Sequence, residues 1–247
     1  MSMPFDGLWS AHSSNRLDPK YHLFQREAAR PVPPNWKKVP IRTVMRRRLQ
    51  VAEPEKEPDG QFKVMTISQT GDIRLRAAGK GNNPPEWLGS YLEDMPSTWF
   101  QAKAGDFVYS SIDLWKGCIA VVPADFDGGL VTKEFPIYEV VEPDLSVEFL
   151  QCLLRSRYYQ RAFRAITTGH SNRRRTQSPD FEALEIAYPN DRDEQSRLIA
   201  GILRARENKR VSADALYEQL IEFSNLIDGR GAEQLPEVES EQAPEVD

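Results

Sequence analysis

The middle of the chain alternates between apolar and polar residues, which is the period of a β-strand with one buried face. Residues 62–67 and 72–76 both alternate in this way, and Thr70-Gly71 lies between them. Glycine permits the backbone of a tight turn, so the two segments predict a β-hairpin. Short apolar runs bounded by turn residues predict further strands at residues 107–109, 117–123, 137–141 and 185–188.

Three other segments carry helical signals. Residues 36–50 predict a strand that enters a short helix. Residues 146–166 have apolar positions at helical spacing, with Ser146 as the N-cap of the helix. Residues 193–228 predict a helix about 54 Å long, at about 1.5 Å per residue. We therefore expect an α+β fold, in which a mixed sheet with packed helices is followed by one long coiled-coil-type helix.

The long helix carries an apolar stripe in heptad steps, interrupted near its middle by two basic residues. Such a stripe needs a partner surface, because exposure of large apolar side chains to water is unfavourable. Antiparallel pairing with a second copy would give a two-fold dimer, and pairing with a helix of another protein is the alternative. The stripe residues that we assign to dimerisation or partner binding are Ile199, Ile202, Arg206, Lys209, Leu216, Leu220, Phe223 and Ile227.

The formal net charge of -5 conceals a strong segregation of charge. The last 15 residues hold six acids and no base; removing these six from the 37 acidic residues leaves 31 against 32 basic ones. Residues 28–52 and residues 149–179 each hold seven basic residues and no acid. Two such segments indicate a surface that faces a polyanion. The alternative is that they are ordinary solvated faces, balanced in space by carboxylates from elsewhere.

Composition excludes several other classes of protein. No apolar run approaches the roughly 20 residues of a membrane span, and residues 1–6 do not begin a signal peptide. The two cysteines, Cys118 and Cys152, are too few for a disulfide framework and read as small buried hydrophobic residues, so we expect a cytoplasmic protein. The three histidines lack metal-ligand spacing, and we expect neither a metal nor a cofactor.

An ordered series of motifs resembles a known family. Residues 104–111 (AGDFVYSS), residues 117–123 (GCIAVVP) and the helix at 147–166 are similar to a target recognition domain of the specificity subunits (HsdS) of type I restriction–modification systems. Thr168-Gly169, Arg173-Arg174, FEALEI at 181–186, Pro189 and EQSRLI at 194–199 continue the resemblance in the same order, and NRLDPKY at 15–21 and WKKV at 36–39 resemble family openings. The resemblance covers about residues 15 to 228, with one recognition domain and one long helix where the family usually has two of each.

The resemblance implies a non-catalytic subunit that recognises double-stranded DNA and directs a separately encoded DNA methyltransferase, with or without a restriction subunit, to its target. Together with the composition of the two ends of the chain, it predicts a division of the chain into four parts. These are an extended arm at residues 1–35, a DNA target recognition domain at 36–190, a dimerisation or spacer helix at 191–229, and a disordered acidic tail at 230–247.

Arginine can pair with phosphate or with guanine, and short polar side chains can meet base edges, so these residue types suit both contacts that a recognition domain makes. The residues that we expect to contact phosphates are Arg46, Arg47, Arg48, Arg173, Arg174 and Arg175. The residues that we expect to contact base edges are Ser110, Ser111, Asp113, Lys116, Gln69 and Thr70.

Two other functions remain open at this point. A protein adaptor would use the long helix to bind a partner, and its arginines would be ordinary surface. An atypical DNA methyltransferase would be suggested by Asn83-Pro84-Pro85-Glu86, which is similar to the Asn-Pro-Pro-Tyr motif of amino-methyltransferases. Glutamate stands there in place of the aromatic residue that stacks on the target base, and a turn is the simpler interpretation.

Overall fold

The computed structural model describes residues 32–76, 87–93, 98–169 and 174–228. Most of the expected arm at 1–35 and the acidic tail at 230–247 therefore lie outside the described residues. The chain divides into two compact units, residues 1–199 and residues 200–247. The first unit is an α+β domain with small antiparallel sheets and packed helices, and a long helix continues into the second unit, so the predicted fold class is confirmed.

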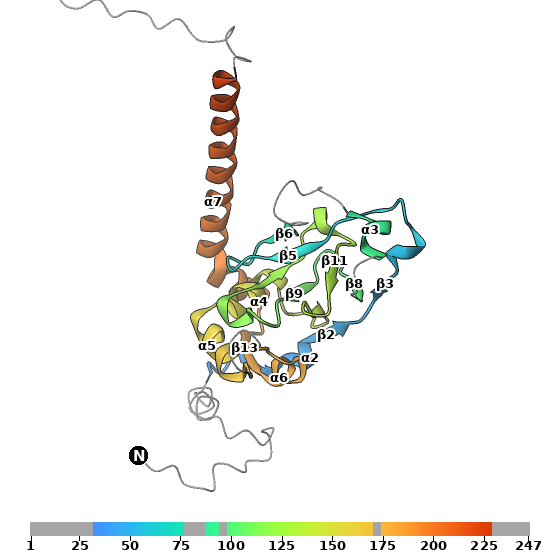
Figure 1. Ribbon diagram of the computed structural model, residues 1–247. Helices are drawn as coiled ribbons and strands as arrows, with labels where there is room; N and C mark the ends of the chain where they lie inside the picture. Colours follow the sequence, from blue (N-terminus) through green and yellow to red (C-terminus); the bar gives the residue numbers. More distant parts are fainter. Residues whose placement is uncertain (1–31, 77–86, 94–97, 170–173, 229–247) are drawn as a thin grey trace, which may run out of the picture. The chain divides into compact units, whose positions relative to one another are not determined.

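A four-stranded antiparallel sheet forms the centre of the domain (Figure 1). Its strand order is β10-β9-β12-β2, with β10 Ile119–Val121, β9 Phe107–Tyr109, β12 Ile137–Val140 and β2 Met45–Arg48. Three of these strands confirm the predictions made from apolar runs. The fourth strand, β2, was not predicted. Residues 36–50 were expected to be a strand followed by a short helix, but only the single turn of α2 (Ile41–Val44) is helical and the chain then continues as β2.

Smaller sheets surround the central one. Two strands far apart in the sequence, β1 (Trp36–Pro40) and β13 (Glu185–Pro189), pair antiparallel over their whole lengths. The predicted hairpin is confirmed as β5 (Met65–Ile67) paired with β6 (Ile73–Leu75). The remaining sheets join β11 (Leu130–Thr132), β8 (Trp99–Gln101) and β3 (Val51–Ala52) in that order, and β4 (Gln61–Phe62) with β7 (Trp87–Leu88). The short helical elements are η2 (Pro54–Lys56), α3 (Gly89–Glu93), η3 (Leu114–Lys116), η4 (Ala124–Phe126) and α6 (Ser178–Ala183).

The single helix expected at residues 146–166 is wrong, because the structure has two helices there. They are α4 (Val147–Leu154) and α5 (Arg157–Ile166). Ser146 caps α4, as predicted, and its Oγ accepts a hydrogen bond from the Phe149 amide at 3.2 Å. Ser156 has an extended backbone and caps α5 in the same way. A serine that bonds the backbone ahead of it favours a new helix start over continuation of the old helix.

The helices cover one face of the central sheet and the hairpin side of the domain covers the other. On β9, Phe107 and Tyr109 face a cluster that includes residues of α4, α5 and α6, whereas Val108 faces a second cluster that includes Met65 of the hairpin. Alternate residues of a strand point to opposite faces, and this explains why the run at 107–109 is apolar throughout. Cys118 is buried in the second cluster, as predicted, and burial raises the pKa of its thiol to about 11.

The long helix α7 spans Arg192–Ile227, within one residue of the predicted bounds. Its first two turns belong to the domain. The buried Gln195 side chain donates hydrogen bonds to the carbonyls of Asp144 and Pro189 and accepts one from the Ser146 amide, each at 2.8 Å. Ile199, expected on the partner stripe, is only 5% exposed and packs in the domain core. We therefore remove Ile199 from the stripe and begin the stripe at Ile202.

Candidate nucleic-acid interface

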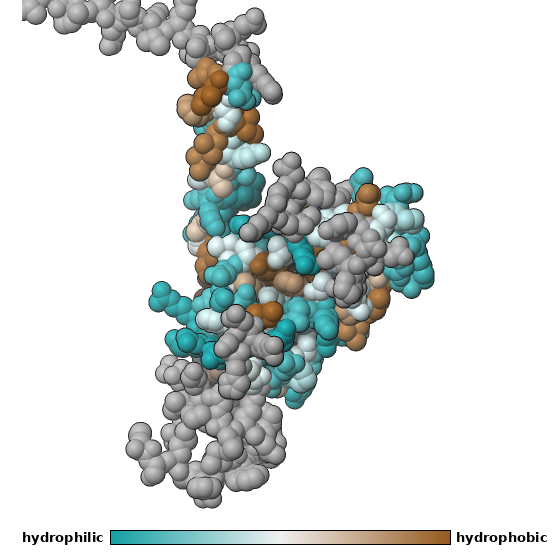
Figure 2. All heavy atoms as spheres, in the orientation of Figure 1, coloured by the Kyte–Doolittle hydropathy of each residue, from teal (hydrophilic) through white to brown (hydrophobic). Residues whose placement is uncertain are grey.

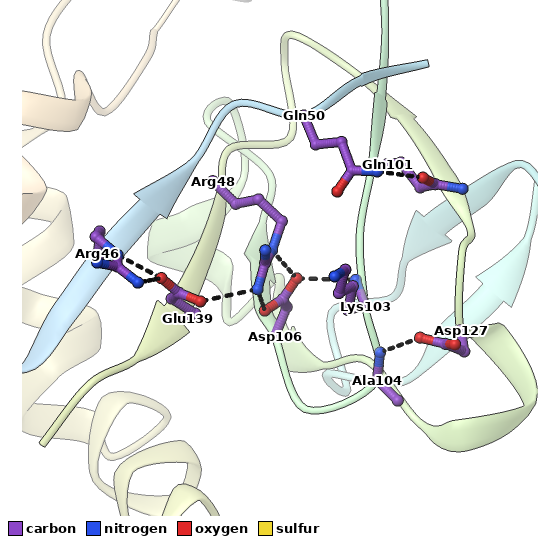
Figure 3. Close-up of polar contacts among 9 residues, drawn as sticks. All are labelled: Arg46, Arg48, Gln50, Gln101, Lys103, Ala104, Asp106, Asp127 and Glu139. Atoms are coloured by element: carbon purple, nitrogen blue, oxygen red, sulfur yellow. Dashed lines mark hydrogen bonds and ion pairs between the residues drawn. The ribbon is translucent and has the colours of Figure 1, made fainter. Parts of the chain in front are cut away.

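The three arginines of β2, all expected to grip phosphates, have three different environments. Arg48 lies only 20% exposed between two carboxylates. Its Nε and Nη2 donate to the two oxygens of Asp106 at 2.7 and 3.1 Å, and Nη2 also donates to Glu139 at 2.9 Å (Figure 3). These acceptors raise the pKa of the Arg48 guanidinium, led by its hydrogen bond to Asp106. Arg48 is therefore a structural residue, and its expected phosphate contact is corrected.

The neighbours of Arg48 are more accessible. Arg46 is 72% exposed and pairs with the other oxygen of Glu139. Hydrogen bonding from Arg46 is the first cause of a lowered pKa at that carboxylate. Arg47 is exposed, and within the described chain its side chain makes no hydrogen bond or ion pair. Of the three, Arg47 is the arginine with its charge available to a ligand.

The serines expected to read base edges are buried instead. Ser110 and Ser111 are 8% and 7% exposed, and the Ser111 hydroxyl donates to Glu134 at 2.8 Å. This burial argues against their expected role, because a hydroxyl must be accessible at the protein surface to contact a base edge. The two other candidates on this loop bind each other, with Lys116 Nζ 2.8 Å from the Asp113 carboxylate. Both are about one-third exposed, and their contact with DNA stays a prediction.

The basic loop at residues 168–175 is anchored at both ends. The backbone amides of Thr168 and Arg175 each bond the other residue's carbonyl, at 3.0 and 2.8 Å. The Arg175 side chain donates to both oxygens of Glu134, at 2.9 and 3.1 Å, and this pairing is the first cause of a lowered pKa at Glu134. Arg175 thus fastens the loop to the domain. Arg174 is exposed, and Arg173 lies outside the described residues.

The tip of the β5–β6 hairpin is exposed at Gln69 and Thr70, as a contact to DNA requires. The Thr70 hydroxyl is already engaged, since it donates to the Asp72 carboxylate at 2.5 Å. The hairpin tip also lies against the turn at Gly117, where an added Cβ would stand 3.0 Å from the Gln69 carbonyl oxygen. Gly117 has a φ of 97°, which together with this contact requires glycine. The hairpin tip and the loop after β9 are therefore neighbours.

A polar cleft of about 490 Å³ lies beside these residues and was not predicted from the sequence. Arg76, Lys133 and Glu134 line it, together with hydroxyl groups and apolar side chains from several strands. The hydroxyl-bearing and apolar residues of the cleft are Thr66, Thr98, Ser110, Thr132, Ile112 and Phe135. Arg76 and Lys133 lie outside the two acid-free basic segments, so the charge pattern did not mark them.

The structure adds little to the catalytic alternatives. Asn83-Pro84-Pro85-Glu86 lies outside the described residues. In the part of the chain that is described, no three histidine, cysteine, aspartate or glutamate side chains are grouped as metal ligands. No helix of that part is both long and apolar enough to cross a lipid bilayer.

Comparison with known proteins gives matches in structure only. No family model and no curated protein sequence matches the chain. The HsdS subunit from Thermoanaerobacter tengcongensis matches with a TM-score of 0.57 and 21% sequence identity, over 88% of this chain and 54% of that chain. A structure described in work on complex assembly and conformational transition of the type I R-M system matches equally well, with a TM-score of 0.57, 21% identity, and coverage of 87% and 53%. The chain thus has the fold expected from the motif resemblance and spans about half the length of these relatives.

Proposed function

We propose that this chain is a single-domain specificity subunit of the type I restriction–modification kind. Its role is to bind a defined sequence in double-stranded DNA and to direct a separately encoded DNA methyltransferase, with or without a restriction subunit, to that sequence. The observation that carries the proposal is the structural match to an HsdS subunit over 88% of this chain. The order of motifs in the sequence, which resembles the same family, supports it. The subunit itself would contribute recognition and no chemical step, and would act in the cytoplasm.

The distribution of charge supports DNA as the ligand. Three of the predicted phosphate contacts form ion pairs within the described chain, and Arg48 and Arg175 are less exposed than the third, Arg46. These two arginines neutralise buried or half-buried carboxylates. Arg47 and Arg174 remain at the surface. An exposed arginine without a carboxylate partner keeps its full charge for phosphate, and release of counterions from DNA then favours binding. We retain these two among the predicted phosphate contacts.

The exposed surface of the long helix supports the proposal that a partner binds there. From residue 201 to residue 228 every residue is exposed except Arg206, which is half-exposed. Apolar side chains gather on the C-terminal part of α7 (Figure 2). The stripe residues Leu216, Leu220, Phe223 and Ile227 are between 54% and 68% exposed. We propose an antiparallel dimer through this stripe, which would carry two recognition domains and read a two-part palindromic target. A methyltransferase helix is the competing partner.

The proposed dimer is tested by substituting the stripe and a matched position outside it. Leu216→Glu with Leu220→Glu places two charges in the seam, whereas Val211→Glu changes a residue that is 52% exposed and outside the stripe spacing. Light scattering should give a dimer for the full chain and for Val211→Glu, and a monomer for the double variant. A full chain that is monomeric at high micromolar concentration contradicts self-pairing.

The proposed function is tested by expressing the full chain with an adenine methyltransferase subunit encoded beside it. Sequencing of the host DNA should then reveal methylated adenines within one recurring sequence, which is absent when either subunit is omitted. Selection of duplexes from a random pool by the pure complex should enrich the same sequence. Failure of the chain to bind any duplex, with and without the methyltransferase, would overturn the proposal in favour of a protein adaptor.

A further inference from the structure

Two adjoining hollows on the domain share lining residues, and basic side chains from three separate segments line them. The cleft of about 490 Å³ has Arg76 and Lys133 in its lining. A much smaller hollow beside it, of about 10 Å³, has Arg47 and again Lys133 in its lining, and Phe135 also borders both. Lys133 thus lies between the two hollows, with Arg76 at one side and Arg47 at the other. The three cations come from β2, from the end of the hairpin and from the turn after β11.

The carboxylates near these hollows are already neutralised by other residues. Glu134 lines the cleft but accepts two hydrogen bonds from Arg175. Arg48 lines the smaller hollow but is held by Asp106 and Glu139. Each of these ion pairs offsets its own charge, which leaves Arg47, Arg76 and Lys133 as the lining cations that have no hydrogen-bonded carboxylate among the described residues. Lys133 acts on Glu134 only through space, as the smallest of the causes that lower the pKa of that carboxylate.

Arg47, Arg76 and Lys133 are those remaining residues. Among the described residues, none of the three side chains makes a hydrogen bond or an ion pair. Arg47 and Lys133 are exposed, and Arg76 is half-buried. The cleft between Arg76 and Lys133 is bordered by the hydroxyls of Thr66, Thr98 and Thr132, so it is polar and open to solvent. A row of such cations beside a polar groove suits the phosphates of a nucleic-acid backbone.

We propose that Arg47, Lys133 and Arg76 form one track that contacts the phosphates of the DNA backbone, with Lys133 at its centre. The proposal rests on the proposed function, since it takes duplex DNA as the ligand. It keeps Arg47 from the arginine clusters of the sequence and adds Arg76 and Lys133, which lie outside them. In the protein, the track takes the place of Arg48 and Arg175 as the phosphate grip. Its residues position the domain on the duplex without selecting a sequence.

The track is tested by the salt dependence of DNA binding, because each phosphate contact adds about 0.9 to the slope of log K against log salt. Fluorescence anisotropy with a 30-base-pair duplex, used with the full chain and its methyltransferase partner, gives this slope. The triple variant Arg47→Ala, Arg76→Ala, Lys133→Ala should lower the slope by roughly three, and each single variant by roughly one. The sequence enriched from a random pool should stay the same.

A control variant separates local contacts from a general loss of charge. Arg42→Ala, Lys103→Ala, Arg157→Ala removes the same number of charges from exposed residues that line neither hollow. It should change the slope by less than one, and the urea midpoints of both triple variants should match that of the unsubstituted chain. The inference is overturned if the control lowers the slope as much as the track variant, or if the track variant binds with an unchanged slope. If the unsubstituted chain binds no duplex, the proposed function fails together with the track.

Discussion

Replacing Arg48 with alanine should cost much more folding free energy than replacing Arg46, although the two arginines are neighbours in one basic run. Arg48 is 20% exposed and makes three hydrogen bonds to Asp106 and Glu139, whereas Arg46 is 72% exposed and pairs with Glu139 alone. Removal of Arg48 leaves the carboxylate of Asp106, which is 3% exposed, with the Lys103 amide as its remaining hydrogen-bond donor among the described residues.

The size of the effect follows from this burial. Breaking a buried ion pair by removing one partner costs about 3–5 kcal/mol, and a hydrogen bond to a charged group contributes about 1.5–3 kcal/mol. Because Arg48 keeps some contact with solvent, we expect its replacement to cost about 2–4 kcal/mol. The exposed Arg46 pair should contribute less than about 1 kcal/mol.

Urea unfolding, followed by tryptophan fluorescence, measures both variants against the unsubstituted chain. With a slope of about 2 kcal/mol per molar urea, Arg48→Ala should lower the midpoint by about 1–2 M and Arg46→Ala by less than about 0.5 M. Adding Asp106→Ala to Arg48→Ala should recover part of the loss, because the unpaired buried charge is then removed.

Equal urea midpoints for Arg48→Ala and Arg46→Ala would refute this account. So would a loss of unfolding free energy in the double variant, Arg48→Ala with Asp106→Ala, that exceeds the sum of the losses in the two single variants. DNA binding gives an independent check. A drop of about one in the salt slope of folded Arg48→Ala would show that Arg48 contacts a phosphate after all.

Two further predictions concern the loop anchors. The pKa of Glu134 is lowered below its ordinary value of 4.5, chiefly by its hydrogen bond with Arg175. The ionised carboxylate therefore stabilises the fold at pH values above 4.5, and this stabilisation is lost as the pH falls through the lowered pKa. Thermal unfolding should therefore show the unsubstituted chain losing its advantage over Glu134→Gln as the pH is lowered below 4.5; a constant difference would contradict this. Gly117→Ala should cost at least about 1 kcal/mol more than Gly105→Ala in urea unfolding. Both glycines have positive φ, but an added Cβ meets the Gln69 carbonyl at 3.0 Å only at Gly117 and meets nothing within 4 Å at Gly105, so equal costs would rule out the contact.

Secondary-structure elements with a clear periodicity and clear turn residues were predictable from the sequence. The boundary between two adjacent helices with one continuous apolar stripe was less predictable. The hairpin and α7 follow from periodicity and turn residues within each segment, and both agree with the structure. The helix expected at 146–166 was divided by Ser156, whose cap is a local signal of moderate strength inside an otherwise continuous apolar stripe. The apolar stripe is continuous across the break because residues of both α4 and α5 pack in the same core cluster, so the stripe alone could not show where one helix ends.

The candidate site, too, was predictable only in part. The sequence by itself determined which segments are basic and where the long helix begins and ends, and its motifs were the basis for expecting the fold that the structure has. Only the tertiary structure decided which cations are available, because their partners are remote in sequence: Asp106 lies 58 residues from Arg48, and Glu134 lies 41 residues from Arg175. Ion pairs and clefts depend on distances in space, and those distances are set by the sheets that bring Arg76 and Lys133 to one cleft.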